Sequence, residues 1–194
     1  MSTGANLAYM KFKFLCLLTL LLFACENSQP LLGDVHEHAD FKGYLEGEAY
    51  DFAQDKYMSS DEHKLSNFTH LHDGDGELIH KHMSTITLGD FFESLGMQFT
   101  AECFKLDGGS FYCNEGEKTL KIFVNGEPNN EFGDYELSDL DQILITYGDE
   151  SDEEIQAQID SVGDRACIQS ETCPERGEPS DESSCLSSGD CTAL

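Results

Sequence analysis

Basic residues are scarce in this chain of 194 residues, which has 11 lysines and arginines against 38 aspartates and glutamates. The formal net charge of −27 repels phosphate, which argues against nucleic acid and against anionic lipid as surface partners. A Cys-x-x-Cys motif is also missing, so a thioredoxin-like redox motif is excluded. No second apolar segment follows the N-terminal one. The acidity instead favours solubility and the capture of cations.

The N-terminal segment has the pattern of an export signal. Residues 14–24 carry no charge and follow Lys11 and Lys13, and this apolar run is too short to span a bilayer as a helix. Met10 gives a better positive region than residues 1–9, so we expect translation to start there. The alternatives are an ordinary cleaved signal and an uncleaved anchor.

The run Leu22-Phe23-Ala24-Cys25 resembles the lipobox of bacterial lipoproteins, with a small residue before the cysteine. This resemblance implies that residues 1–25 are a lipoprotein signal peptide and that Cys25 becomes the lipidated N-terminus. Two or more acyl chains give firm anchoring. We therefore expect an extracytoplasmic protein of the cell envelope that is held to a membrane by its lipid.

Six cysteines follow the signal: Cys103, Cys113, Cys167, Cys173, Cys185 and Cys191. An even number in an exported chain predicts three disulfides. Cys103 and Cys113 flank a turn at residues 107–110 symmetrically, which favours a cross-hairpin disulfide over a reactive pair, because nothing nearby activates either thiol. Among the other four, pairing of 167 with 173 and of 185 with 191 competes with crossed arrangements.

Composition divides the rest of the chain. Residues 26–33 are a short tether, and residues 34–148 carry nearly all the alternating apolar pattern. Residues 149–194 contain thirteen acids, four cysteines and no aromatic residue, which predicts an acidic tail stapled by disulfides. This tail begins with a possible helix over residues 152–162, where Ile155, Ile159 and Val162 have helical spacing.

The fold class predicted for residues 34–148 is α+β. Hairpins are expected at 40–52, 69–87 and 104–112, a short helix begins at Thr87, and strands are expected at 120–124 and 143–147. Thr87 and Asp90 suit the start of the helix, and Gly96 suits its end. The order of hairpin, helix and three strands is that of a β-grasp fold. We therefore expect a β-grasp-like mixed sheet with an extra N-terminal hairpin.

All seven histidines lie between residues 36 and 82, and six of them form His-x-His pairs: His36 with His38, His70 with His72, and His80 with His82. Residues two apart on a strand point to the same face, so each pair is a two-pronged imidazole fork. One such pair is common by chance, whereas three within so short a stretch indicate a metal site.

The register of the second hairpin decides whether two forks meet. A three-residue loop, residues 74–76, would place His70 opposite His80 and Leu71 opposite Ile79, with Gly76 in the left-handed conformation that such loops need. An even loop would leave the two forks on opposite faces. Because the apolar and histidine patterns agree on the first register, we expect His70, His72, His80 and His82 to share one face.

Four neutral imidazoles on one face suit Zn²⁺ or Cu²⁺. His36 and His38 would add a further fork if the first hairpin pairs beside the second. Nearby groups that could complete or orient the site are Asp40, Glu77, Asp73 and Glu37, and Met58 and Met83 would favour Cu(I). Protons compete with metal, so affinity is expected to fall below a pH of about 6.5. The alternative is a solvated polar face with incidental histidines.

A calcium loop at residues 73–84 is excluded by its spacing. An EF-hand needs glycine at its sixth position and glutamate at its twelfth, and these positions hold Leu78 and Ser84. A turn explains the Asp-Gly-Asp-Gly run better.

Five segments carry a family resemblance: HEHADF (36–41), THLHDGDGELIHKH (69–82), TLGDFFESLGMQF (87–99), LKIFVNGEP (120–128) and DQILITYGDE (141–150). Together they resemble a His-rich exported family of archaea and little-studied bacteria, whose members carry a hypothetical or loosely assigned disulfide-isomerase label. The resemblance covers about residues 34–173 and implies that the histidine pairs are the site. The end of the domain is also similar to β-grasp domains of the transcobalamin-C-like kind.

The function expected from the sequence is a lipid-anchored metal-binding protein that holds copper or zinc outside the cytoplasm and is not an enzyme. One alternative is an enzyme, either a thiol–disulfide oxidoreductase using Cys103 and Cys113 or a metal-dependent hydrolase. Another is a non-catalytic scaffold or adhesion module.

Overall fold

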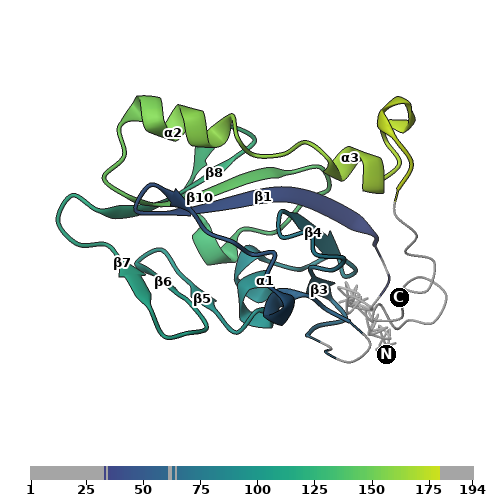
Figure 1. Ribbon diagram of the computed structural model, residues 1–194, viewed down its shortest axis with the longest axis horizontal. Coiled ribbons are helices and arrows are strands. Elements are labelled where there is room, and N and C mark those ends of the chain that lie inside the picture. The colour runs from purple at the N-terminus through teal and green to yellow at the C-terminus, as the bar shows by residue number, and fades with distance from the viewer. Residues whose placement is uncertain (1–32, 34, 61–62, 64, 180–194) are drawn as a thin grey trace, which may run out of the picture.

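The computed structural model describes residues 33, 35–60, 63 and 65–179 (Figure 1). The predicted signal peptide, lipidation at Cys25, and Cys185 and Cys191 lie outside the described residues. Within them the protein is α+β and consists mostly of sheet. None of the helices in these residues has the length and apolar character needed to cross a membrane.

The strands are β1 (Glu37–Leu45), β2 (Glu48–Ala49), β3 (Thr69–His70), β4 (Leu78–Lys81), β5 (Gln98–Phe99), β6 (Cys103–Lys105), β7 (Phe111–Cys113), β8 (Thr119–Val124), β9 (Glu127–Asn129) and β10 (Gln142–Gly148). The helices are α1 (Leu88–Ser94), α2 (Asp152–Ile159) and α3 (Ala166–Gln169), with single 3₁₀ turns at Asp55–Tyr57, Phe132–Asp134 and Pro174–Arg176.

Among the described residues, seven strands form the main sheet in the order β3-β4-β1-β10-β8-β9, with β2 paired to β1. β1 and β10 are parallel neighbours in its middle, and every other pairing in this sheet is antiparallel. A smaller sheet has the order β5-β6-β7. The sheet is therefore mixed, as the sequence predicted.

One face of the main sheet carries the hydrophobic core. Phe41 of β1 packs against Phe91 and Phe92 of α1, with ring centroids 5.2 and 6.4 Å apart, and against Phe52. Ile79 of β4 faces the same core. Burying an aromatic or aliphatic side chain of this size contributes about 1.5–3 kcal/mol, so this face supplies most of the driving force for folding.

The opposite face is covered by the acidic segment that follows β10. Figure 1 shows α2 and α3 on one side of β1 and β10, with α1 on the other. The contacts are polar: the Tyr44 hydroxyl lies 2.8 Å from Ser161 Oγ, and the Gln142 side chain donates to the carbonyl of Gly163. The part of residues 149–194 that the structure describes thus packs against the sheet.

The local signals in the sequence account for several elements. α1 begins at the Thr87 cap, whose side chain accepts from the Asp90 backbone while Asp90 bonds back, and Gly96 follows the helix with a φ of 75°. Asn125 and Gly126 both have positive φ and join β8 to β9 in a tight turn. α2 ends at Ile159, before the expected Val162.

The predicted loop of the second hairpin is wrong, although its register is confirmed. His70 pairs with His80 as expected, but the left-handed residues are Asp73 and Gly74, which form a tight turn closed by a hydrogen bond from Asp75 N to His72 O. Gly76 is needed for another reason. A Cβ there would lie 2.3 Å from the Ala53 backbone nitrogen, so this position accepts only glycine.

Two disulfides lie within the described residues. Cys103 bonds to Cys113 across the β6–β7 pairing, which confirms the cross-hairpin prediction. Cys167 bonds to Cys173, one of the arrangements that the sequence left open. Disulfides are typical of exported proteins, because the cytosol keeps thiols reduced.

An ion pair joins the small sheet to the main body. Asp107, in the β6–β7 turn, accepts from Lys56 Nζ at 2.9 Å and from the Tyr57 hydroxyl at 2.7 Å. The hydrogen bond from Lys56 is the largest cause that holds the pKa of Asp107 below its ordinary value, with Tyr57 adding to it.

We predict that Asp107→Asn destabilises the protein by about 1 kcal/mol at neutral pH, because it removes the charge from a partly exposed pair. Since the pKa of Asp107 is lower in the folded state, its contribution is complete above the unfolded value of about 3.9 and is lost as pH falls through the lowered folded value. Urea unfolding of both proteins at about pH 7 and about pH 2 measures this.

The difference between wild type and variant should shrink at the lower pH. Asp149→Asn, at an exposed position, is the matched control and should change the free energy of unfolding little at either pH. A difference for Asp107→Asn that is equal at both pH values would contradict the role of its charge.

Candidate metal centre

Three histidines form a row across three neighbouring strands. His38 of β1 is paired with His80 of β4, and His80 is paired on its other side with His70 of β3. Directly paired residues project from the same face of a sheet. This face is the one opposite the aromatic core, because the alternate residues Ala39 and Ile79 belong to the core.

The other three paired histidines join this row. The rings of His36 and His38 have centroids 4.7 Å apart, and those of His72 and His80 lie 3.9 Å apart. His82 stacks between His36 at 5.0 Å and His70 at 5.1 Å. We call these six residues the histidine cluster: His36, His38, His70, His72, His80 and His82. All six predicted histidines are therefore brought together.

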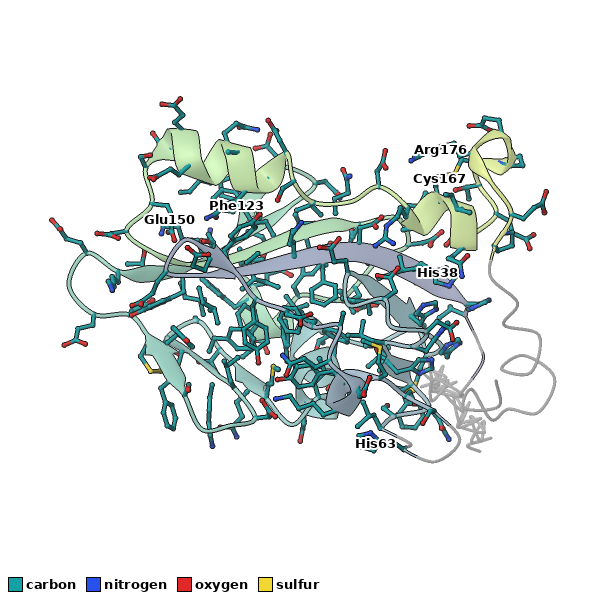
Figure 2. The ribbon with its side chains drawn as sticks, viewed as in Figure 1. His38, His63, Phe123, Glu150, Cys167 and Arg176 are labelled. Carbon is teal, nitrogen blue, oxygen red and sulfur yellow. A yellow bond between two sulfur atoms is a disulfide. The ribbon has the colours of Figure 1, made fainter. Side chains whose placement is uncertain are left out.

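The histidine cluster is buried. His38, His70, His80 and His82 are each at most 1% exposed. His36 and His72 are half-buried at its rim. The alternative of a solvated face is thereby excluded. The seventh histidine, His63, is exposed and lies well away from His38 (Figure 2).

His36, His38 and His80 come closest to a metal-binding geometry. One ring nitrogen from each lies within 4.8 Å of those of the other two. Zinc–imidazole bonds are about 2.0–2.1 Å long, so tetrahedral ligand nitrogens stand about 3.3 Å apart. Modest rotations of these side chains would close the set around one ion. This trio takes only His80 from the four histidines expected to share one face, and adds His38 of β1 and His36, which lies just before β1.

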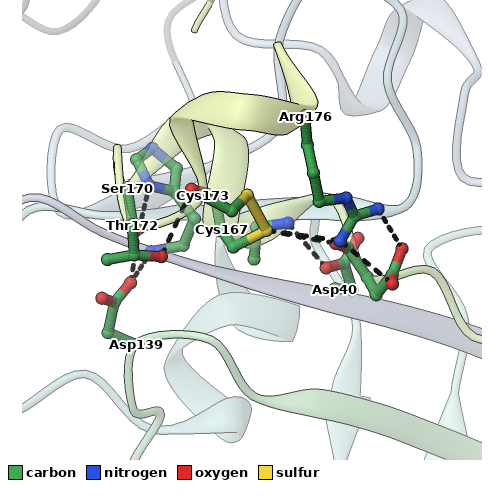
Figure 3. The surroundings of a disulfide bond; sticks show 10 residues. Asp40, Asp139, Cys167, Ser170, Thr172, Cys173 and Arg176 are labelled. Carbon is green, nitrogen blue, oxygen red and sulfur yellow. Dashed lines mark hydrogen bonds and ion pairs between the residues drawn. A yellow bond between two sulfur atoms is a disulfide. The ribbon is translucent and has the colours of Figure 1, made fainter. Parts of the chain in front are cut away.

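His38 is held by a two-step hydrogen-bond relay. Its Nδ1 lies 2.8 Å from Ser170 Oγ, and that hydroxyl donates to Asp139 Oδ1 at 2.5 Å, as the dashed lines at Ser170 in Figure 3 show. A hydroxyl has one proton, so Ser170 accepts from His38. Nδ1 of the neutral ring therefore carries the proton, and a metal would bind through Nε2. Metal-ligating histidines in general have such an outer partner.

Two further histidines have the same kind of outer partner. His70 Nδ1 lies 3.0 Å from the carbonyl oxygen of Ser66, and His72 Nδ1 lies 2.8 Å from Asp73 Oδ2. In both, Nδ1 is engaged, so metal ligation would again use Nε2. Of the four acidic residues considered from the sequence, Asp73 contacts a ring of the histidine cluster, that of His72.

The other predicted helpers have different partners. Glu37 pairs with Lys81 at 2.7 Å and Glu77 pairs with Lys42 at 3.1 Å. Asp40 accepts from the backbone of Ala166 at 2.7 Å, and burial is the largest cause that raises its pKa. Met58 and Met83 pack with the hydrophobic core, on the other side of the sheet from the histidines. This placement gives no support to the expectation that these methionines assist Cu(I).

The segment from Gly163 to Cys173 covers the histidine cluster. It is fixed by three contacts: Asp40 to Ala166, Ser170 to His38, and Arg165 to Asp75, where two guanidinium nitrogens lie 2.6 and 3.0 Å from the carboxylate. A pocket of about 270 Å³ remains beside this segment. It is lined by His72, Asp73, Asp75, Leu78, His80, Arg165, Ile168 and Gln169.

Ser170 and Asp139 were not found from the sequence. They are 31 residues apart, and Ser170 lies 132 and Asp139 101 residues from His38, so no local spacing connects them. Ser170 lies between two cysteines and Asp139 lies in a turn. Both residue types are common in such places, so neither indicates a site. Only the packing of the covering segment brings them to the histidine.

Comparison with known proteins adds no relative: no protein-family model, curated protein or solved structure matches this chain.

We predict that Ser170→Ala disturbs the His38 ring. In the wild type the Nδ1 proton of neutral His38 is held by Ser170, so ¹⁵N NMR should show Nδ1 protonated and slow to exchange with solvent. The variant lacks the acceptor, so that proton should exchange faster or move to Nε2.

Ser161→Ala is the matched control, because Ser161 also lies in the acidic part of the chain after β10 but bonds to Tyr44. It should leave the His38 signals unchanged. An identical His38 spectrum in wild type and Ser170→Ala would show that the relay does not orient the ring.

Proposed function

We propose that the protein is an extracytoplasmic metal-binding protein whose histidine cluster holds a transition-metal ion, copper or zinc. The observation that carries this proposal is the convergence of ring nitrogens from His36, His38 and His80 within 4.8 Å. Imidazole nitrogen is a ligand that both metals accept, and copper binds a given site of this kind more tightly.

Rigidity and burial support the same conclusion. His38 and His80 sit on paired central strands and are 1% exposed, so little conformational entropy remains to be lost on binding. Burial of several polar rings is unfavourable unless each is well partnered. A bound metal ion would offset the unfavourable free energy of this burial, because it would replace protons and water as the partner of the inward ring nitrogens.

We also propose that the fold is an elaborated β-grasp. Two features support it. The first and last long strands, β1 and β10, pair in parallel, and α1 lies in chain order between β4 and the later strands β8 and β10 of the same sheet. Membership of the His-rich exported family rests on the five quoted segments alone. Fold and family do not by themselves give function, so the metal proposal rests on the site.

Export and anchoring complete the proposal. The two disulfides support an oxidising compartment, and the lipobox-like residues 22–25 support lipidation at Cys25. A metal-holding domain on a lipid anchor would face the envelope, outside the reducing cytosol.

We predict that purified wild-type protein, stripped with chelator and reloaded, retains Cu²⁺ or Zn²⁺ after dialysis and gains thermal stability from it. The triple variant His36→Gln/His38→Gln/His80→Gln should retain less metal per chain, because three converging nitrogens are gone. Elemental analysis and thermal unfolding measure both effects.

His63→Gln is the control, since His63 lies outside the histidine cluster. It should bind as much metal as the wild type. Failure of the wild type to retain either metal, or full retention by the triple variant, would refute the proposed site.

We predict that Cys25→Ser blocks lipidation, so the protein is released from the membrane fraction or accumulates with its signal uncleaved. Fractionation and mass spectrometry of the N-terminus measure this. Cys16→Ser, in the same apolar run, should be processed normally. Membrane retention and maturation of Cys25→Ser that equal those of the wild type would contradict lipid anchoring.

A further inference from the structure

Six imidazoles exceed what one ion takes from a protein. Zinc sites are almost always four-coordinate, and open sites use three protein ligands. When the trio of His36, His38 and His80 is assigned to one ion, three buried or half-buried histidines of the same cluster are left over: His70, His72 and His82. Burying further polar rings on this face is unfavourable unless each has a partner.

These three also form a connected group. The ring of His70 has its centroid 5.6 Å from that of His72 and 5.1 Å from that of His82. His70 lies in β3, His72 follows that strand and His82 follows β4, whereas the first trio comes from β1, the residue before it and β4. The group is in ring contact with the first trio through His72 and His80, at 3.9 Å, and through His82 and His36, at 5.0 Å.

Outer hydrogen bonds give a second, independent sign of metal ligation. His70 Nδ1 is engaged by the Ser66 carbonyl and His72 Nδ1 by the Asp73 carboxylate. A carbonyl or a carboxylate on the outer nitrogen is the usual arrangement behind a metal-ligating histidine. The same arrangement holds His38 in the first trio, through Ser170. His38 in the first trio and His70 and His72 in the second thus each have Nδ1 engaged, which leaves Nε2 as the nitrogen that would bind a metal.

Nearby negative charge can offset two dications. Asp73 lies behind His72, and Asp139 lies behind His38 through Ser170. Asp40 is next along β1 on the same face of the sheet, and the chain as a whole has a formal charge of −27. The 270 Å³ pocket has His72, His80 and Asp73 in its lining, together with Asp75, which is paired with Arg165. A cation that enters it meets two imidazoles and the Asp73 carboxylate.

We propose that the histidine cluster binds two transition-metal ions side by side, the first at His36, His38 and His80 and the second at His70, His72 and His82. This inference rests on the proposed function, because it extends the same metal site. The two ions would be neighbours, because the two trios are in ring contact through His72 and His80 and through His82 and His36.

Stoichiometry tests it. Native mass spectrometry of the chain loaded with excess Zn²⁺, then exchanged into buffer without metal, should show two ions in the wild type and in His63→Gln. His36→Gln/His38→Gln/His80→Gln should hold one ion, and His70→Gln/His72→Gln/His82→Gln should hold one ion.

The outcomes separate the two proposals. One ion in the wild type overturns the second site and leaves the proposed function standing, whereas no ion overturns both. Loss of all metal in either triple variant also overturns the inference, because it indicates one shared site.

Milder variants guard against misfolding, since four of the six rings are buried. His36→Gln and His72→Gln each change a half-buried rim position. With two equivalents of Cu²⁺, electron paramagnetic resonance of the wild type should show a signal broadened or lost through coupling of neighbouring ions. Each single variant, loaded with one equivalent, should show a simple mononuclear signal. Two uncoupled mononuclear signals in the wild type would contradict neighbouring ions.

Discussion

The pairing of β4 with strands on both its sides determines where every histidine of the site lies. Because His80 is paired with His38 and with His70, a slip of one residue at either pairing would turn a whole fork into the aromatic core. The apolar residues prevent that slip. Ala39 and Ile79 are paired and belong to the core, so the register that buries them also gathers the imidazoles on the other face.

That other face needs a cover, and the cover is made from the acidic segment after β10. The segment has few apolar residues to bury, so polar contacts hold it: Asp40 to the start of α3, and Arg165 to Asp75. The disulfide between Cys167 and Cys173 closes the short loop that carries Ser170, beside the ion pair of Arg176 and Asp164 (Figure 3). A covalent closure restricts the unfolded chain, which suits a segment with little hydrophobic driving force.

Much of this could be predicted from the sequence, because the relevant signals are local. Each of three signals spans only a short stretch of sequence. They are the capping residues of α1, the Asn125-Gly126 turn, and the apolar and histidine patterns that both pair His70 with His80. The exact turn was missed because either glycine of the Asp-Gly-Asp-Gly run could take the left-handed conformation, and the contact of Gly76 with Ala53 decides between them. The burial of the cluster was missed because composition marks residues 149–194 as a tail.

The two faces of the sheet differ, because one carries the apolar core and the other carries the histidine cluster. The aromatic core contains Phe41, Phe91 and Phe92, and it would remain if the histidines on the opposite face were exchanged for side chains of similar size. The polar face gains less from burial, because each hydrogen bond made there replaces one to water. Its relays instead restrict each ring to one orientation, as Ser170 and Asp139 do for His38. A fold that concentrates its apolar packing on one side can keep a buried cluster of histidines on the other.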